Sequence, residues 1–71
     1  MPLDEKAWRE ILGKQQSVVT RVQAIALGWH RTAVEHRLGR TWQRLLPSVY
    51  LTTTGVPTWE QKAWAGLLLA G

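Results

Sequence analysis

The chain has 71 residues, of which 45% are hydrophobic and 20% are charged, and its formal net charge is +4. A chain of this length forms one domain, and the composition is typical of a folded domain rather than a disordered segment. The sequence contains no cysteine, which excludes disulfides, thiolate nucleophiles and cysteine-ligated zinc, and it has no apolar run long enough to span a membrane. These features lead us to expect a cytoplasmic protein.

The excess positive charge lies in the middle of the chain. Residues 1–19 and 47–71 are each neutral overall, whereas residues 20–46 carry arginines opposed by Glu35 alone. These arginines are Arg21, Arg31, Arg37, Arg40 and Arg44. The guanidinium group presents a planar set of donors that matches phosphate oxygens and guanine edges. A basic stripe confined to one segment is typical of proteins that bind nucleic acids or other anionic surfaces.

The N-terminal part of the chain predicts one helix and one short extended segment. Apolar residues recur at spacings of three and four between Leu3 and Gln15, which is the pattern of an amphipathic helix. The adjacent β-branched residues Val18 and Val19 then favour an extended backbone.

The next stretch predicts two short helices joined by a tight turn. Thr20 and Gln23 have the spacing of a capping box, at which a helix begins, and Gly28 is suited to end that helix. A second short helix is predicted over residues 31–38, with Val34 on its apolar face. Two such helices around a glycine-containing turn form the helix-turn-helix pattern.

The C-terminal part predicts a hairpin and a final helix. Residues 42–45 and 49–53 are rich in β-forming residues and flank Pro47, which indicates two strands joined by a turn. Thr58 and Gln61 form a second capping box, at which the last helix begins.

The last helix is apolar on nearly every side from Ala63 onward, which is unusual for a surface helix of a free-standing domain. We therefore expect either that the chain is the N-terminal part of a longer protein or that it forms a homodimer through this helix.

The predicted order is helix, strand, helix, helix, strand, strand, helix, which is a mainly α fold with a small β-hairpin wing. This order predicts a single winged helix-turn-helix domain over residues 1–71. In such a domain the second helix of the pair enters the major groove of DNA, and the first crosses the backbone.

The periodicity of the second helix predicts which side chains face DNA. At about 100° per residue, positions opposite Val34 and Leu38 point away from the core. We expect Thr32, Ala33, His36 and Arg40 to face the groove, and Arg31 to meet a phosphate. The complete set of predicted DNA-binding residues is Arg21, Arg31, Thr32, His36, Arg37, Arg40 and Arg44.

Three side chains near this surface have two interpretations each. Arg37 either contacts a phosphate or lies over the apolar seam with its charged end in water. Arg44 either follows the DNA from the wing or is a solvated strand residue. Glu35 either accepts a hydrogen bond from cytosine or pairs with Arg31 four residues before it. The tryptophans predicted to lie in the core are Trp8, Trp42, Trp59 and Trp64.

The sequence offers little support for catalysis. His30 and His36 are six residues apart, which on one helix would place them on nearly opposite faces and prevent them from sharing a metal. The chain has no glycine-rich phosphate loop and no carboxylates paired for acid–base work. We expect no enzymatic activity, no cofactor and no metal.

Two stretches carry a resemblance to a known family. Residues 16–28, QSVVTRVQAIALG, and residues 42–53, WQRLLPSVYLTT, resemble the N-terminal winged-helix domain of the AbiEi-family antitoxins, in the form found in high-GC Gram-positive bacteria. The resemblance extends over residues 8–71. It implies a domain that binds inverted repeats in its own promoter and represses a type IV toxin–antitoxin operon. Related proteins carry this domain ahead of a Vsr-like endonuclease fold.

Two positions depart from the family pattern. Ser48 stands where the family often has glycine after the hairpin proline, which disfavours a turn with a positive φ there. His30 stands where the family often has serine before the recognition helix, and histidine is a poorer N-cap.

We therefore expect a sequence-specific DNA-binding domain of an antitoxin-like transcriptional regulator, bound to double-stranded operator DNA with inverted repeats. Two alternatives remain. The domain could target a Vsr-like nuclease to DNA, or it could be a protein-interaction winged helix that contacts a partner through Trp29 or the final helix.

Overall fold

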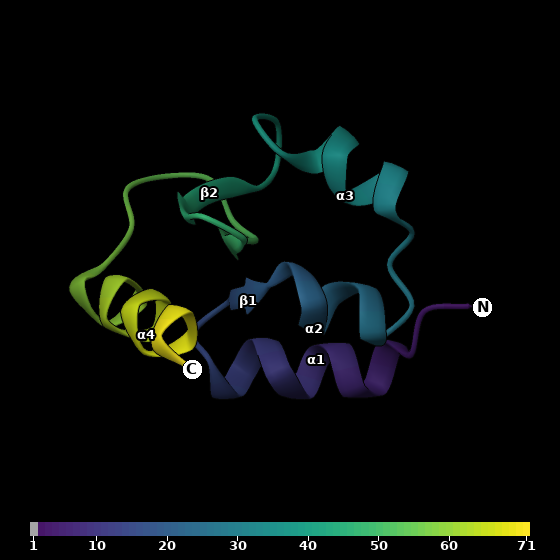
Figure 1. Ribbon diagram of the computed structural model, residues 1–71, viewed down its shortest axis with the longest axis horizontal. Coiled ribbons are helices and arrows are strands. Elements are labelled where there is room, and N and C mark those ends of the chain that lie inside the picture. Colours follow the sequence, from purple (N-terminus) through teal and green to yellow (C-terminus); the bar gives the residue numbers. More distant parts are fainter. Residues whose placement is uncertain (1) are drawn as a thin grey trace.

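The computed structural model describes residues 2–71, so that Met1, with which the predicted domain begins, lies outside the described residues. Four helices and three strands follow one another along the chain, and Figure 1 shows their arrangement. They are α1 (Glu5–Lys14), β1 (Val18–Thr20), α2 (Arg21–Ala26), α3 (Arg31–Arg37), β2 (Gln43–Leu46), β3 (Val49–Leu51) and α4 (Trp59–Ala70). The molecule is a small α/β domain, and this arrangement is compatible with a winged helix.

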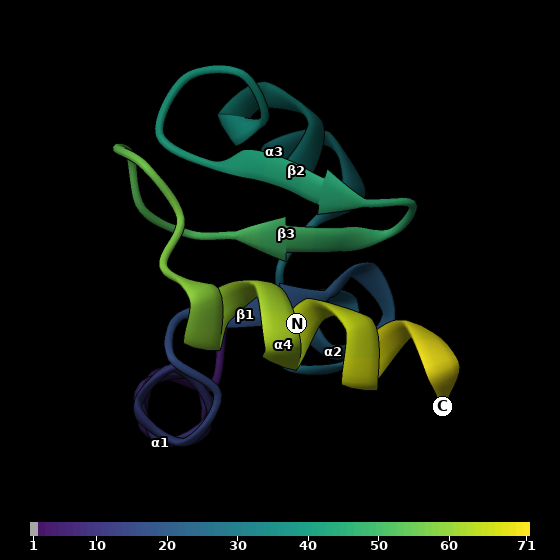
Figure 2. The ribbon, with the colours of Figure 1, turned by 90° about the vertical axis from the view of Figure 1, so that its left-hand side faces the viewer.

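The strands form one antiparallel sheet in the order β1-β3-β2. The predicted hairpin is confirmed, and β1, predicted only as an extended segment, pairs with the other edge of β3. Val19 lies opposite Tyr50 in this pairing. The hairpin of β2 and β3 is seen in Figure 2, with α4 beside the sheet. Its register shifts between Arg44 and Leu46, where the strand is irregular.

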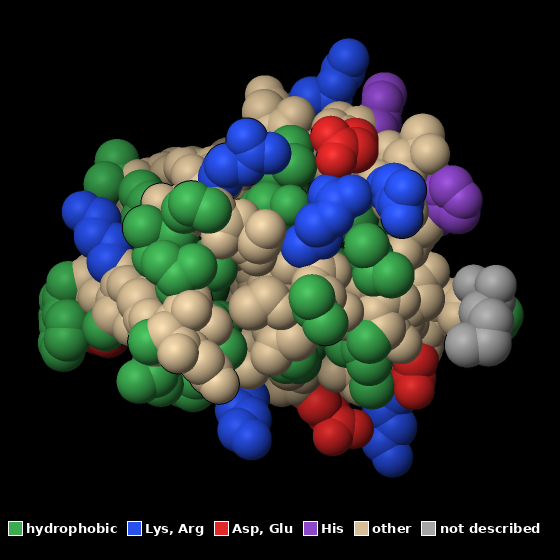
Figure 3. Space-filling view, in the orientation of Figure 1, with side chains coloured by type: hydrophobic (Ala, Val, Ile, Leu, Met, Phe, Trp, Pro, Cys, Tyr) green, Lys and Arg blue, Asp and Glu red, His purple; other side chains and the backbone are tan. Residues whose placement is uncertain are grey.

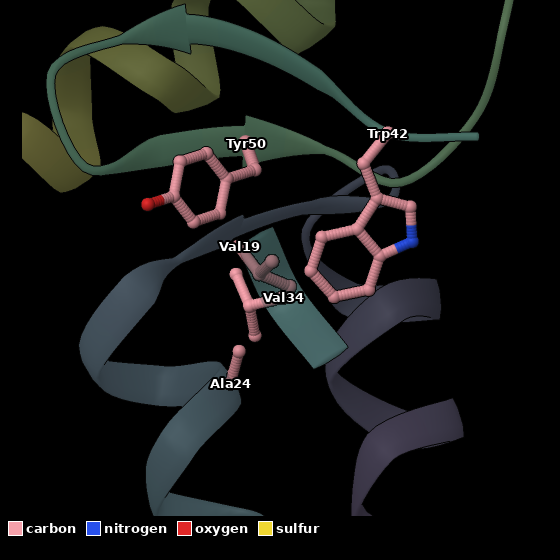
Figure 4. Packing of buried hydrophobic residues seen from close by; sticks show 5 residues of the cluster. All are labelled: Val19, Ala24, Val34, Trp42 and Tyr50. Atoms are coloured by element: carbon pink, nitrogen blue, oxygen red, sulfur yellow. The ribbon is translucent and has the colours of Figure 1, made fainter. Parts of the chain in front are cut away.

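β1 and β3 are largely buried on both faces of the sheet, whereas β2 is partly exposed, and side chains alternate between two apolar clusters. Val18, Val49 and Leu51 pack on one face against Ala65 of α4. On the other face, a second cluster joins the sheet to α2 and α3, and Figure 4 shows its members pointing toward one another. This cluster consists of Val19, Ala24, Val34, Trp42 and Tyr50. The helix-turn-helix pair and α4 are therefore held on opposite faces of one sheet.

Both predicted capping boxes are confirmed. The Thr20 hydroxyl accepts from the backbone N–H of Gln23, and the Gln23 side chain accepts in return from the backbone N–H of Thr20. Thr58 and Gln61 repeat this exchange at the start of α4. These reciprocal bonds satisfy donors that the first turn of a helix leaves free, so both helices begin where the sequence predicts.

The tryptophans divide between core and surface. Trp42 is buried and Trp8 and Trp64 are half-buried, whereas Trp59 is 75% exposed. The prediction of a core position for Trp59 is therefore wrong, because this first residue of α4 points away from the sheet. Trp29, which the sequence leaves unplaced, packs against Trp8 and Trp42 with ring centroids 5.4 Å and 4.9 Å apart.

The final helix packs on the sheet along one side and is exposed along the other. Ala65 is buried and Leu68 is half-buried against the sheet, while Leu67 and Leu69 are exposed. Within residues 2–71, no helix combines the length and the apolar character needed to cross a bilayer.

Candidate nucleic-acid interface

α3 presents an exposed ridge on the side away from the core. Val34 is fully buried beneath it and fixes the helix on the sheet side. Thr32 and His36 are exposed, as the helical periodicity predicts, and Arg31 is exposed as well. Ala33, which is predicted to face the groove, is only half-exposed. Within residues 2–71, the rest of the protein leaves the side chains of Arg31, Thr32 and His36 accessible to solvent. The ridge is therefore open to a partner.

His30 caps the start of α3. Its Nδ1 accepts a hydrogen bond from the backbone N–H of Thr32, with the two nitrogens 3.1 Å apart. The imidazole nitrogen of His30 thus takes the capping role that the hydroxyl oxygen of serine would have, and the expectation that histidine is the poorer cap stays a prediction. The bond fixes the backbone that presents Arg31 and Thr32.

Arg40 reaches the interface from a turn and not from α3. The helix ends at Arg37, and the backbone of Leu38 is extended at φ −64° and ψ 130°. The backbone N–H groups of Arg40 and Trp42 then both donate to the carbonyl of Arg37, at 3.1 Å and 3.0 Å. The helical periodicity that predicts a groove-facing Arg40 therefore does not apply, because Arg40 lies beyond the helix. Its side chain is nevertheless exposed.

The turn after α3 and the edge strand of the sheet enclose an open depression of about 630 Å³. Arg40 and Arg44 both line it. The Gln43 side chain donates to the carbonyls of Thr53 and Gly55, at 2.9 Å and 2.7 Å, and so fastens the loop that follows β3. Two arginines from different parts of the chain thus line one concave surface.

Arg21 is committed to contacts within the protein. Its Nη1 lies 3.0 Å from Oε1 of Glu35 and 3.5 Å from the hydroxyl of Tyr50. The hydrogen bonds to Tyr50 and Glu35 raise the pKa of Arg21 above its ordinary value. Glu35 therefore pairs with Arg21 and not with Arg31, because α2 brings a guanidinium group from fourteen residues away. A phosphate would have to compete with this pair for Arg21.

Arg37 lies over an apolar side chain, as the second of its two interpretations has it. Its guanidinium carbon lies 5.0 Å from the centroid of the Trp29 ring, and the side chain is otherwise exposed. A cation over an indole face is attracted by the ring quadrupole. The sequence reveals neither this contact nor the packing of Trp29, because both depend on how segments distant in the sequence pack around the turn before α3.

The charged side chains are unevenly distributed over the surface. Figure 3 shows basic and His side chains gathered over α3 and the hairpin, with one acidic side chain among them and further acidic and basic ones on the side of α1. Among residues 2–71, no group of three or more His, Cys, Asp or Glu side chains is arranged to hold a metal ion. The basic surface around α3 is therefore the most distinctive chemical feature of the described residues.

No family model, curated protein or solved structure matches this chain. The resemblance to AbiEi-family antitoxins therefore rests on the quoted residues alone.

Proposed function

We propose that this chain is a winged helix-turn-helix domain that binds double-stranded DNA through α3 and acts in the cytoplasm as a binding module, not as an enzyme. The observation that carries the proposal is the exposed ridge of Arg31, Thr32 and His36 above the buried Val34. A short helix anchored on one side and open on the other suits insertion into a major groove.

The arrangement supports a division of roles among the basic residues. Arg31, Arg40 and Arg44 are exposed and are free to approach phosphates, which supply most of the affinity. Thr32 and His36 lie on the ridge and would contact base edges. Arg21 and Arg37 already have partners, Glu35 and the Trp29 ring, so their share of phosphate binding is smaller.

The resemblance over residues 16–28 and 42–53 supports a narrower proposal. The domain would bind inverted repeats upstream of its own gene and repress a toxin–antitoxin operon. Targeting of a nuclease would use the same surface, and a reporter gene under the chain's own promoter separates the two roles. Repression by this chain supports the regulator, and binding without repression supports targeting.

A protein-interaction role is the second candidate, favoured by the exposed apolar side chains of α4. Leu67 and Leu69 are exposed there without a described partner. An interaction domain of this kind would show no salt-dependent binding to duplex DNA, whereas a DNA-binding domain would.

A gel-shift series over a range of salt concentrations tests the proposal, with the DNA upstream of the gene and a random duplex as probes. If Arg31, Arg40 and Arg44 each neutralise a phosphate, log affinity should fall with log salt at a slope of about −3. We expect His36→Ala and Arg40→Ala to weaken binding to the upstream DNA while the helical circular dichroism signal is retained.

Arg9→Gln is the matched control, because Arg9 is an exposed arginine on α1. It should leave the slope unchanged, while Arg31→Gln should make it shallower by about one. A slope near zero for the unmodified chain contradicts DNA binding. If His36→Ala loses affinity for the upstream DNA and for the random duplex equally, His36 does not contact bases in a sequence-specific way.

A further inference from the structure

Glu35 is an acid in the middle of a basic surface. It is the only Asp or Glu among residues 20–46, and it stands on α3 directly before His36. Its side chain is 57% exposed. A carboxylate at that position repels phosphates and so lowers the non-specific affinity for DNA. Glu35 therefore weakens DNA binding unless it also makes a favourable contact with a base.

The pairing with Arg21 leaves part of this carboxylate free. Arg21 contacts Oε1, and within residues 2–71 no hydrogen bond reaches Oε2. An ionised carboxylate has about four acceptor positions on its two oxygens. The exposed oxygen can therefore accept a further hydrogen bond while the ion pair stays intact.

Arg21 itself is held in place from three sides. Its backbone N–H donates to the carbonyl of Ser48 at 2.9 Å, and its guanidinium group contacts both Glu35 and Tyr50. The contacts join the start of α2, the middle of α3 and strand β3. They orient the Glu35 carboxylate and offset part of its charge when water is removed from the surface.

We propose that Glu35 is a specificity-determining residue, which accepts a hydrogen bond from the N4 amino group of a cytosine in the major groove. This inference rests on the proposed function. In the major groove, cytosine N4 and adenine N6 are the amino donors, while guanine O6 and N7 and thymine O4 are acceptors that repel a carboxylate. Adenine also presents the N7 acceptor beside its amino group, so cytosine suits a carboxylate better. Glu35 thus selects by rejecting sequences as well as by binding the correct one.

A purely structural role for Glu35 makes a different prediction. An ion pair this exposed contributes little to stability, so its removal leaves the fold intact. If the pair only joined α2 to α3, variants at Glu35 would select the same DNA sequences as the unmodified chain. The base preference therefore separates the two roles.

The test is selection of bound sequences from a random duplex library by the full chain and its variants. The unmodified chain should select a site with one required cytosine. Glu35→Ala should relax that position alone, with a loss of discrimination of roughly tenfold or more, and should bind random duplex more tightly. Glu35→Gln keeps the shape and the contact with Arg21, and it should shift the preference from cytosine toward adenine.

Glu10→Gln is the control for net charge, because Glu10 is an exposed acid on α1. It should select the same sequences as the unmodified chain. A cytosine requirement that persists in Glu35→Ala overturns the inference and leaves the proposed function standing. If the unmodified chain selects no sequence and shows no salt-dependent binding, both proposals fail.

Discussion

Ser48 has a backbone conformation that serine rarely adopts. It follows Pro47 in the turn between β2 and β3, and its φ is 61°. A proline followed by a residue of positive φ is the arrangement of a type II turn, in which glycine is favoured at the second position. The expectation that serine prevents this conformation is wrong, because pairing of β3 with strands on both sides holds the turn in place.

This residue yields a stability prediction. An L-residue in the left-handed region costs about 1–2 kcal/mol, and the greater freedom of an unfolded glycine returns about half of that. We expect Ser48→Gly to stabilise the domain by up to about 1 kcal/mol, which corresponds to a rise of several degrees in the melting temperature. Calorimetry measures this change.

Two variants at the same position serve as controls. Ser48→Ala retains the positive φ and should melt close to the unmodified chain, while the β-branched Ser48→Val should melt lower. A melting temperature for Ser48→Gly at or below that of Ser48→Ala would show that the turn stores no strain.

Two glycines with positive φ follow the short helices α2 and α3. Gly28 follows α2 with a φ of 112°, and a Cβ there would lie 2.6 Å from the Pro2 carbonyl oxygen and 2.7 Å from the Leu3 Cα. Gly39 follows α3 with a φ of 81°, but a Cβ there would meet no atom within 4 Å. Both positions favour glycine for their conformation, and only Gly28 also requires it for a close approach.

A comparison of three alanine variants separates these effects. Gly39→Ala should cost about 1 kcal/mol, the backbone strain less the greater freedom of unfolded glycine, and Gly28→Ala should cost more because the N-terminal segment must also move. Gly13→Ala, in α1 with open space around it, should stabilise the domain by up to about 1 kcal/mol. Urea unfolding gives the three values. If Gly28→Ala and Gly39→Ala lower the free energy of unfolding equally, the segment at Pro2 moves aside without destabilising the domain.

Elements whose signals are local were predictable from the sequence, and contacts between distant elements were not. The capping boxes at Thr20 and Thr58 depend on residues three positions apart, so the starts of α2 and α4 follow from the sequence. The pairing of β1 with β3 joins residues about thirty positions apart, and nothing near β1 specifies its partner.

In the candidate interface, too, features set by one helix were predictable from the sequence and contacts between elements were not. The exposed positions of Thr32 and His36 follow from the period of one helix. The partner of Glu35 does not, because a rule for neighbours on one helix suggests Arg31, while the tertiary fold supplies Arg21. Arg40 was misplaced for a related reason, since the sequence extends α3 past Arg37.

α4 leaves part of its apolar surface exposed, without a described partner. It packs on the sheet through Ala65 and Leu68, while Leu67 is 67% exposed and Leu69 is 51% exposed. Figure 3 shows hydrophobic side chains at the surface on this side of the molecule. α4 and the helix-turn-helix pair lie on opposite faces of the sheet. Contact through α4 would therefore leave α3 of each copy free to meet its own half-site of an inverted repeat.

We accordingly expect two copies of the chain to associate through α4. Burying a leucine side chain contributes about 1.5–3 kcal/mol, so Leu67 and Leu69 from two copies together favour a dimer at raised protein concentration. Sedimentation equilibrium should show a dimer for the unmodified chain and a monomer for Leu67→Lys combined with Leu69→Lys. Val22→Lys is the matched control, because Val22 is 75% exposed on α2, and this variant should still dimerise. A chain that stays monomeric at millimolar concentration contradicts the dimer, and each copy would then bind its half-site independently.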